Sequence, residues 1–193
     1  MLATLLDALV PSCCIACDGP TVDALCARCS ESVERAPAQF VSAFAYGGPI
    51  ADAIRAAKFR RDAAVADALA RLWVERAELP AIDVVTFVPA PFRRRLKRGF
   101  DLPAVLARAL AKHARVPFVD ALRCTRADAP LSFGADKAAR AVIVSGRFRA
   151  RRSLAGLRVL LVDDVRTTGA TLAEAARALD AREVVQASLA VVL

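Results

Sequence analysis

Apolar and polar positions follow two kinds of pattern along this chain. Continuous apolar runs that contain β-branched residues lie at 83–91 and 158–162, and such runs are typical of strands buried on both faces of a parallel sheet. Apolar residues recur at helical spacing within 50–59, 62–79 and 102–114. Because strands alternate with helices, the pattern predicts an α/β fold with a parallel sheet flanked by helices.

Further apolar segments predict the remaining elements. Residues 40–46 and 183–193 are expected to form strands, and 116–122 and 141–148 are short strand candidates. We expect the apolar N-terminal stretch to form a short helix packed on the body. A secretory signal would begin with Lys or Arg, and this stretch has neither. No apolar run reaches the ~18 to 20 residues of a membrane span. We therefore expect a cytoplasmic protein, with export as the alternative.

The end of the buried run at 158–162 carries the most informative residues. Asp163 and Asp164 follow the last apolar residue, at the strand end where parallel sheets carry their ligands. A turn of small hydroxyl residues comes next, before a helix that is expected to begin near Thr171. The N–H groups of a helix N-terminus and a glycine that permits close approach predict an anion site. Helix capping alone would explain one Thr or Asp, not all of them. The turn comprises Arg166, Thr167, Thr168, Gly169 and Ala170.

A second candidate site follows the buried run at 83–91. Five cations fall within residues 93–98 and are followed by Gly99. A solvated loop is one interpretation. We favour the other, a mobile loop that closes over a polyphosphate and neutralises its charge. The cations are Arg93, Arg94, Arg95, Lys97 and Arg98.

The overall charge agrees with an anionic partner but does not identify it. The net charge is +8 and the pI is about 9.7, which suits phosphorylated ligands or nucleic acid. The sequence is also rich in Ala and Arg, so local clustering of charge is more informative. The sole histidine, His113, lies in a helical pattern and is expected to be a surface or half-buried residue rather than a catalytic one.

Five of the six cysteines precede residue 30. Two CxxC pairs supply four thiolates, enough for one tetrahedral zinc ion. The alternatives are a disulfide pair in an exported protein and a redox-active CxxC, and Cys13 could replace its neighbour as a ligand. We predict a zinc module over residues 1–35 and a main domain over 36–193. The predicted ligands are Cys14, Cys17, Cys26 and Cys29.

Residues 159–171 resemble the phosphoribosyl pyrophosphate (PRPP) signature of type I phosphoribosyltransferases. That resemblance implies a type I phosphoribosyltransferase-like fold. It assigns the ribose hydroxyls to Asp163 and Asp164 as the catalytic pair, and the 5′-phosphate to Thr167 through Thr171. It also implies Mg²⁺ bound together with PRPP. The basic segment would hold the pyrophosphate through Arg94, Lys97, Arg98 and Gly99.

The whole chain resembles the ComF family, also called ComFC- or GntX-like, which is implicated in DNA uptake during natural competence. Paired CxxC knuckles, Lys58-Phe59 at a helix end, the motif "VPAP…RRxxxRGFD" and the PRPP signature occur here in the order found in that family. Asp101-Leu102 stands where typical members have Asn-Gln. Typical members also carry a Gln and later an Asn ahead of the segment that corresponds to 146–148, but here there is neither Gln nor Asn between Thr125 and Phe148.

Three functions follow from the resemblance. The first is a phosphoribosyltransferase of unknown acceptor. The second is a non-catalytic PRPP sensor that contacts single-stranded DNA or competence proteins such as a DNA-uptake helicase. The third is a general nucleic-acid protein. The last is weakest, because Asp163 and Asp164 would repel a phosphate backbone. Base-salvaging relatives often carry Asp where this chain has Thr167, so an acidic contact to a purine is absent there.

Overall fold

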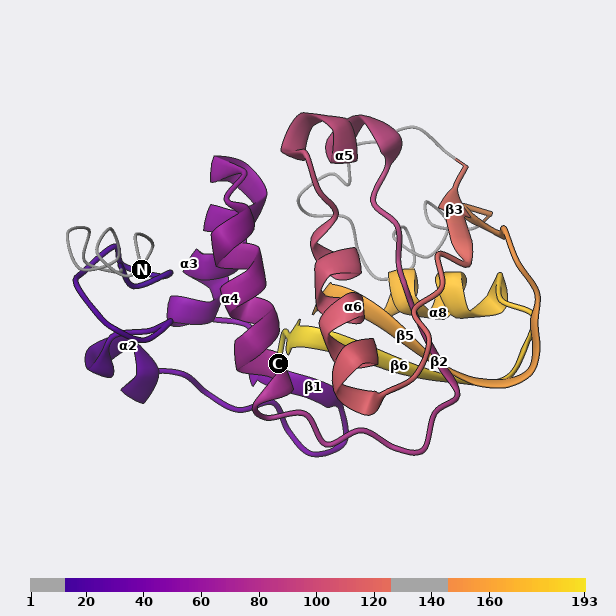
Figure 1. Ribbon diagram of the computed structural model, residues 1–193, viewed down its shortest axis with the longest axis horizontal. Coiled ribbons are helices and arrows are strands. Elements are labelled where there is room, and N and C mark those ends of the chain that lie inside the picture. Colours follow the sequence, from indigo (N-terminus) through magenta and orange to yellow (C-terminus); the bar gives the residue numbers. More distant parts are fainter. Residues whose placement is uncertain (1–12, 126–145) are drawn as a thin grey trace, which may run out of the picture.

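The computed structural model describes residues 13–125 and 146–193 and contains a central four-stranded parallel sheet (Figure 1). The strand order is β1-β6-β5-β2, and every neighbouring pair is parallel. The parallel sheet predicted from the sequence is therefore confirmed. The strands are β1 (Val41–Ala45), β6 (Ala181–Val191), β5 (Leu154–Arg166) and β2 (Val84–Phe87).

The pairing of β2 with β5 brings two distant segments to the same edge of the sheet. Phe87 pairs with Val162, and the N–H of Val88 donates to the carbonyl of Val162 at 2.9 Å. At the amino ends of the same two strands, the guanidinium of Arg158 donates to both carboxylate oxygens of Asp83, at 3.0 and 3.2 Å. The carboxyl ends of the two strands are therefore fixed side by side.

One face of the sheet is covered by most of the helices. These are α3 (Gly48–Arg55), the π-helix η1 (Ala56–Arg60), α4 (Ala63–Val74) and α6 (Leu102–Ala114) (Figure 1). Leu160 and Val162 of β5 belong to the core on this side. Both alternate with residues that face the other way, as expected for a strand buried on two faces.

The opposite face carries a smaller layer. Val159 and Leu161 of β5 pack there with Leu172 of α8 (Ala170–Arg177). An antiparallel pair of short strands, β3 (Leu122–Cys124) and β4 (Phe148–Ala150), completes this side.

The basic segment differs from the prediction. Residues 92–98 form a helix, α5 (Phe92–Arg98), where the sequence indicated a loop. Gly99 ends the helix with φ of 84°, a left-handed conformation that glycine adopts at little cost, and its N–H donates to the carbonyl of Arg95. The glycine thus ends a helix. Helix α5 lies between β2 and α6 in the chain and is placed at one end of the sheet (Figure 1).

Other predicted boundaries shift. The strand expected at 116–122 is reduced to one parallel bridge between Phe118 and Val85, and β3 begins only at Leu122. The strand expected at 141–148 lies mostly outside the described residues, and β4 starts at Phe148. The expected N-terminal helix also lies outside them. The signature strand continues to Arg166, past both aspartates.

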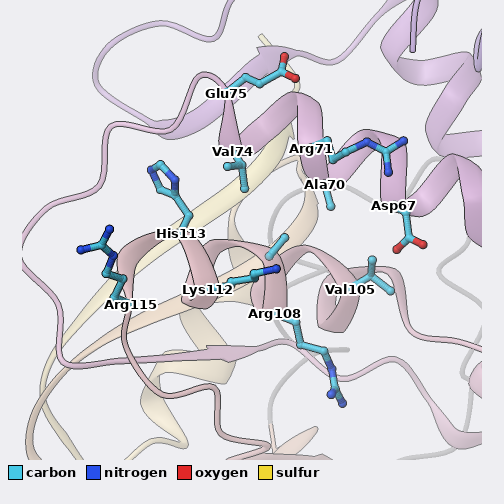
Figure 2. A pocket seen from close by; sticks show the side chains of 11 residues that line it. Asp67, Ala70, Arg71, Val74, Glu75, Val105, Arg108, Lys112, His113 and Arg115 are labelled. Atoms are coloured by element: carbon cyan, nitrogen blue, oxygen red, sulfur yellow. The ribbon is translucent and has the colours of Figure 1, made fainter. Parts of the chain in front are cut away.

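A groove of about 870 Å³ runs between α4 and α6 (Figure 2). Its floor includes Ala70 and Val105, and its rim includes Arg71, Lys112 and the exposed His113. None of the predicted site residues lines this groove. Within 13–125 and 146–193, no helix is both long enough and apolar enough to cross a membrane.

Candidate functional site at the carboxyl edge of the sheet

The paired aspartates lie near the carboxyl end of β5, as the sequence predicts, but inside the strand. Both residues are only partly exposed. The N–H of Asp164 donates to Oδ1 of Asp163 at 2.8 Å. Burial and the neighbouring charge of Asp164 raise the pKa of the Asp163 carboxyl well above its usual value. The pair therefore favours a proton or a nearby cation, which relieves the repulsion between the two carboxylates.

Lys58 is a residue of this site that belongs to a family motif but was not among the predicted site residues. Its Nζ lies 2.7 Å from Oδ1 of Asp164, and the two side chains are only 19% and 13% exposed. The charge of Lys58 also acts to lower the pKa of Asp163. Lys58 reaches the strand end from η1, and π-helical turns are frequent at functional sites. The Lys-aromatic pair at a helix end was visible in the sequence, but its position against β5 was not.

The turn after β5 consists of residues 167–169, because Arg166 still belongs to the strand. Gly169 is the N-cap of α8, is buried, and has φ of 78°. No side chain caps α8 within the described parts of the chain. The N–H of Ala170 makes a long hydrogen bond of 3.4 Å to the Thr168 hydroxyl within the turn itself. The first N–H groups of α8 are therefore available to an anion.

The side chain of Arg166 extends toward Phe40, the residue that precedes β1. Its guanidinium lies 5.2 Å from the centre of the Phe40 ring. A Cβ added at Gly169 would come within 3.1 Å of that guanidinium. Gly169 is thus favoured by its backbone conformation, and a Cβ there would also require the Arg166 guanidinium to move by a few tenths of an ångström.

A basic cavity of about 440 Å³ lies between η1 and α5. The sequence predicted three of its residues, Arg94, Lys97 and Arg98, and the structure adds Lys58 and Arg61. Phe59 also lines the cavity, and its side chain is 76% exposed. The cavity shares Lys58 with the aspartate pair, so the cationic and acidic groups form one continuous site.

Asp101 brings a third carboxyl close to the acid pair. It is buried, and its Oδ2 accepts from the N–H of Ala90 at 2.9 Å. Burial raises the pKa of Asp101 to about 6, although the N–H of Ala90 acts in the opposite direction. The charge of Asp164 contributes to the rise. In the sequence, Asp101 stands out only as a departure from a family motif.

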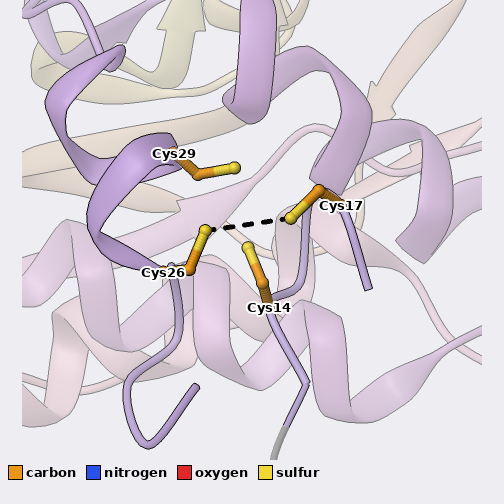
Figure 3. A group of neighbouring side chains, drawn as sticks. All are labelled: Cys14, Cys17, Cys26 and Cys29. Carbon is orange, nitrogen blue, oxygen red and sulfur yellow. Dashed lines mark hydrogen bonds between the residues drawn. The ribbon is translucent and has the colours of Figure 1, made fainter. Parts of the chain in front are cut away.

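The four predicted cysteine ligands come together at the N-terminal end of the described chain (Figure 3). All four Sγ atoms lie within 4.8 Å of one another, and the Sγ atoms of Cys17 and Cys26 are 3.8 Å apart. A tetrahedral ion with bonds of about 2.3 Å needs sulfur atoms about 3.8 Å apart. The cluster can therefore hold a metal ion. The cluster contains Cys14 and not Cys13, whose backbone forms an isolated antiparallel β-bridge with Pro20.

The environment of the cysteines is uneven. Burial raises the pKa of Cys29 to about 12, with hydrogen bonds from the other thiols adding to the effect. Burial acts in the same direction on Cys14, but hydrogen bonds from the backbone N–H groups of Cys26, Ala16 and Cys17 prevail and lower its pKa to about 6. Cys14 and Cys29 also belong to the core that includes Leu69 and Leu160 of the main sheet layer. The cysteine cluster thus packs directly on the body.

The fold and this edge of the sheet define a phosphoribosyltransferase-like protein, and the phosphoribosyl transferase domain matches residues 98–193. The DNA utilization protein YhgH of Salmonella typhi is 30% identical over 184 residues, which cover 89% of this chain and 77% of that protein. The protein of the same name from Escherichia coli K12 is 30% identical over 164 residues, covering 80% and 70%. The chain belongs to the phosphoribosyltransferase-like family of the DNA utilization protein YhgH.

Solved structures also resemble this chain. The allosteric regulatory enzyme of purine biosynthesis is 23% identical, with a TM-score of 0.42, over 64% of this chain and 25% of that one. The chain thus spans about a quarter of that enzyme.

Proposed function

We propose that the carboxyl edge of the sheet binds Mg²⁺·PRPP and that the protein is a ComF-type phosphoribosyltransferase acting in DNA uptake during natural transformation. Asp163 and Asp164 would bind the ribose hydroxyls as the catalytic pair. The turn Arg166, Thr167, Thr168, Gly169, Ala170 and Thr171 would bind the 5′-phosphate. The residues Arg94, Lys97, Arg98 and Gly99 of α5 and its cap would bind the pyrophosphate.

The observation that carries this proposal is the meeting of three complementary groups at one sheet edge. The acid pair lies on β5, the uncapped helix follows it, and α5 follows the adjacent strand β2. Carboxylates suit vicinal hydroxyls, N–H groups at a helix N-terminus suit a phosphate, and clustered arginines suit a polyphosphate. PRPP presents all three kinds of group in one molecule.

The proposed chemistry needs charge stabilisation rather than a strong base. Displacement at the ribose releases pyrophosphate, and Arg98 and Lys97 would neutralise the charge that develops on it. Lys58 would hold Asp164 in place before binding. Mg²⁺, bound together with PRPP, would supply further neutralisation. Within the described residues, no histidine lies at this edge, since His113 lies in the α4–α6 groove.

For the N-terminal segment we propose structural zinc bound by Cys14, Cys17, Cys26 and Cys29. The support is the thiol spacing, which fits a tetrahedral ion. Residues 1–35 would then form a zinc module attached to a phosphoribosyltransferase-like domain over 36–193. Zinc binding would contribute folding free energy to the small segment that holds it.

A second candidate function is that of a non-catalytic PRPP sensor that contacts single-stranded DNA or competence proteins. The exposed ring of Phe59 beside the cations of the basic cavity favours it, because stacking platforms next to basic grooves bind single strands. The name of the relatives, DNA utilization protein, points in the same direction.

Calorimetry with Mg²⁺·PRPP and with ribose 5-phosphate tests the proposal. PRPP should bind and raise the melting temperature, because a ligand of the folded state stabilises it. Ribose 5-phosphate should bind more weakly, since it lacks the group that α5 would hold. Pyrophosphate release with nucleobases or single-stranded DNA as acceptors would distinguish the enzyme from the sensor. Absence of both heat and thermal shift with PRPP would refute the proposal.

A further inference from the structure

A second pocket lies behind α5, on the side of β2 and α6. Its volume is about 390 Å³, within the range of small-molecule sites. Among residues 13–125 and 146–193, three buried side-chain polar atoms have no hydrogen-bond partner, namely Arg95 Nε, Asp101 Oδ1 and Asp120 Oδ1. All three residues line this one pocket.

The two unpartnered carboxylate oxygens belong to side chains whose other oxygen is already hydrogen-bonded. Oδ2 of Asp101 accepts from the N–H of Ala90 at 2.9 Å, and Asp101 is only 8% exposed. Oδ2 of Asp120 accepts from the Arg151 guanidinium at 2.8 Å. Each carboxylate thus keeps one buried oxygen for another donor. Unpaired buried polar groups cost free energy, so their convergence on one cavity points to a ligand that pairs them.

The walls of the pocket favour a flat ligand. Phe87, Phe92 and Phe100 line it. Phe87 stacks on Phe118 with ring centres 5.7 Å apart, and the guanidinium of Arg108, another lining residue, lies 4.5 Å from the Phe118 ring. Aromatic and guanidinium planes bind planar rings by stacking. A water molecule, at about 30 Å³, would occupy only a small part of this space.

The donor and acceptor pattern narrows the ligand class further. The carboxylates of Asp101 and Asp120 offer two acceptors, and Arg95 offers one donor. An exocyclic amino group carries two N–H donors, and the adjacent ring nitrogen of an aminated heterocycle is an acceptor. We propose that this pocket binds a planar, amino-substituted nitrogen heterocycle of the adenine or cytosine kind, with its amino group on the two carboxylates and a ring nitrogen on Arg95.

The pocket adjoins the aspartate pair but is separate from the proposed sugar-phosphate site. Asp101 interacts electrostatically with Asp163 and Asp164, while neither of those residues lines the pocket. The inference goes beyond PRPP binding and does not depend on it. Asp101 and Asp120 give the pocket acidic side chains that can accept from an amino group, whereas the turn has the uncharged Thr167.

Calorimetry with adenine and with unsubstituted purine tests the inference on the full-length protein. The two rings differ only in the amino group, so adenine should bind at least about tenfold more tightly, because purine leaves the two buried carboxylate oxygens unpaired. Asp101→Asn keeps an oxygen for the N–H of Ala90 and turns an NH₂ donor into the pocket. This variant should lose adenine affinity by about tenfold or more, as should Asp120→Asn. The matched control is Asp67→Asn in the α4–α6 groove, which should bind adenine as the parent does.

Equal affinity for adenine and purine would overturn the inference. So would unchanged adenine binding in an Asp101→Asn variant whose melting temperature shows that it is folded. PRPP calorimetry run in parallel separates the two proposals. If PRPP fails to bind while adenine binds selectively, the proposed function falls and the pocket stands. If PRPP binds and adenine does not, the pocket assignment alone is wrong.

Discussion

Lys58 Nζ lies 2.7 Å from Asp164 Oδ1, which joins a π-helical turn to the acid pair of β5. The contact is largely shielded from water, so its charges interact more strongly than those of a surface pair. Lys58 thereby connects the acidic site to the basic cavity between η1 and α5.

Replacing Lys58 with Met should weaken PRPP binding about tenfold or more. The substitution keeps the length of the side chain but removes a cation worth about 1.5 to 3 kcal/mol as a charge-assisted donor. Calorimetry measures the change. Lys112→Met is the matched control, since Lys112 is an exposed lysine in the α4–α6 groove. Parental affinity in Lys58→Met would mean that the pair serves the fold alone.

Two glycines with the same backbone conformation allow a controlled test of the turn. Gly169 and Gly156 both have φ of 78°, but only at Gly169 would a Cβ meet another side chain within 4 Å. Gly→Ala at either position should cost about 1 kcal/mol or more in unfolding free energy. Only Gly169→Ala should also lower PRPP affinity, as measured by calorimetry. Equal effects of the two variants on PRPP binding would contradict the assignment of the phosphate to this turn.

The purified protein should contain about one zinc ion per chain. Cys17→Ser should lose the metal, because three thiolates hold zinc less tightly than four. Cys13→Ser should retain it, since Cys13 lies outside the cluster. Elemental analysis gives the stoichiometry. Equal metal contents in the two variants would show that the cluster is not the binding site.

Asp101 makes stability depend on pH with a defined sign. Its pKa of about 6 in the folded protein exceeds the ordinary value of 3.8, so the folded state binds the proton more tightly. The group therefore favours folding at low pH, and stability is lost as pH rises from about 4 through 6. Asp101→Asn should be progressively more stable than the parent from pH 4 to pH 8, by a difference on the order of 3 kcal/mol. Denaturant unfolding at the two pH values measures it, and a pH-independent difference would contradict the assignment.

Binding of single-stranded DNA, if the basic cavity mediates it, should weaken steeply as salt increases. Lys97→Ala and Arg98→Ala should each reduce both the affinity and its salt dependence. Arg149→Ala, an exposed arginine of β4, is the control. PRPP should compete with DNA, because both would need the same cations. Fluorescence anisotropy with a labelled oligonucleotide gives the result, and salt-independent binding would remove the cavity as the DNA site.

The sequence predicted those parts of the fold that rest on local pattern. The helix over 102–114 was placed correctly at both ends, because its apolar residues recur at helical spacing within the segment itself. Residues 92–98 were assigned to a loop, because a run of cations lacks the apolar stripe by which helices are recognised. No residue of α5 is buried, so there was no packing face to detect.

The candidate site was predictable only where its residues are contiguous. The aspartates and the turn fall in one stretch of sequence, and the four cysteines in another. Lys58 and Asp101 reach the site through the packing of η1 and α6 against β5, a long-range arrangement that spacing does not encode. The pocket behind α5 depends on unpartnered atoms, which only coordinates can identify.

The π-helical turn at Ala56–Arg60 makes the position of Lys58 sensitive to chain length as well as to side-chain identity. An α-helix advances about 100° per residue, and a π-helical turn contains one additional residue. Removing a single alanine from this turn would allow ordinary α-helical geometry and rotate Lys58 away from Asp164. A one-residue deletion could thus disconnect the two halves of the site while every charged side chain remained present.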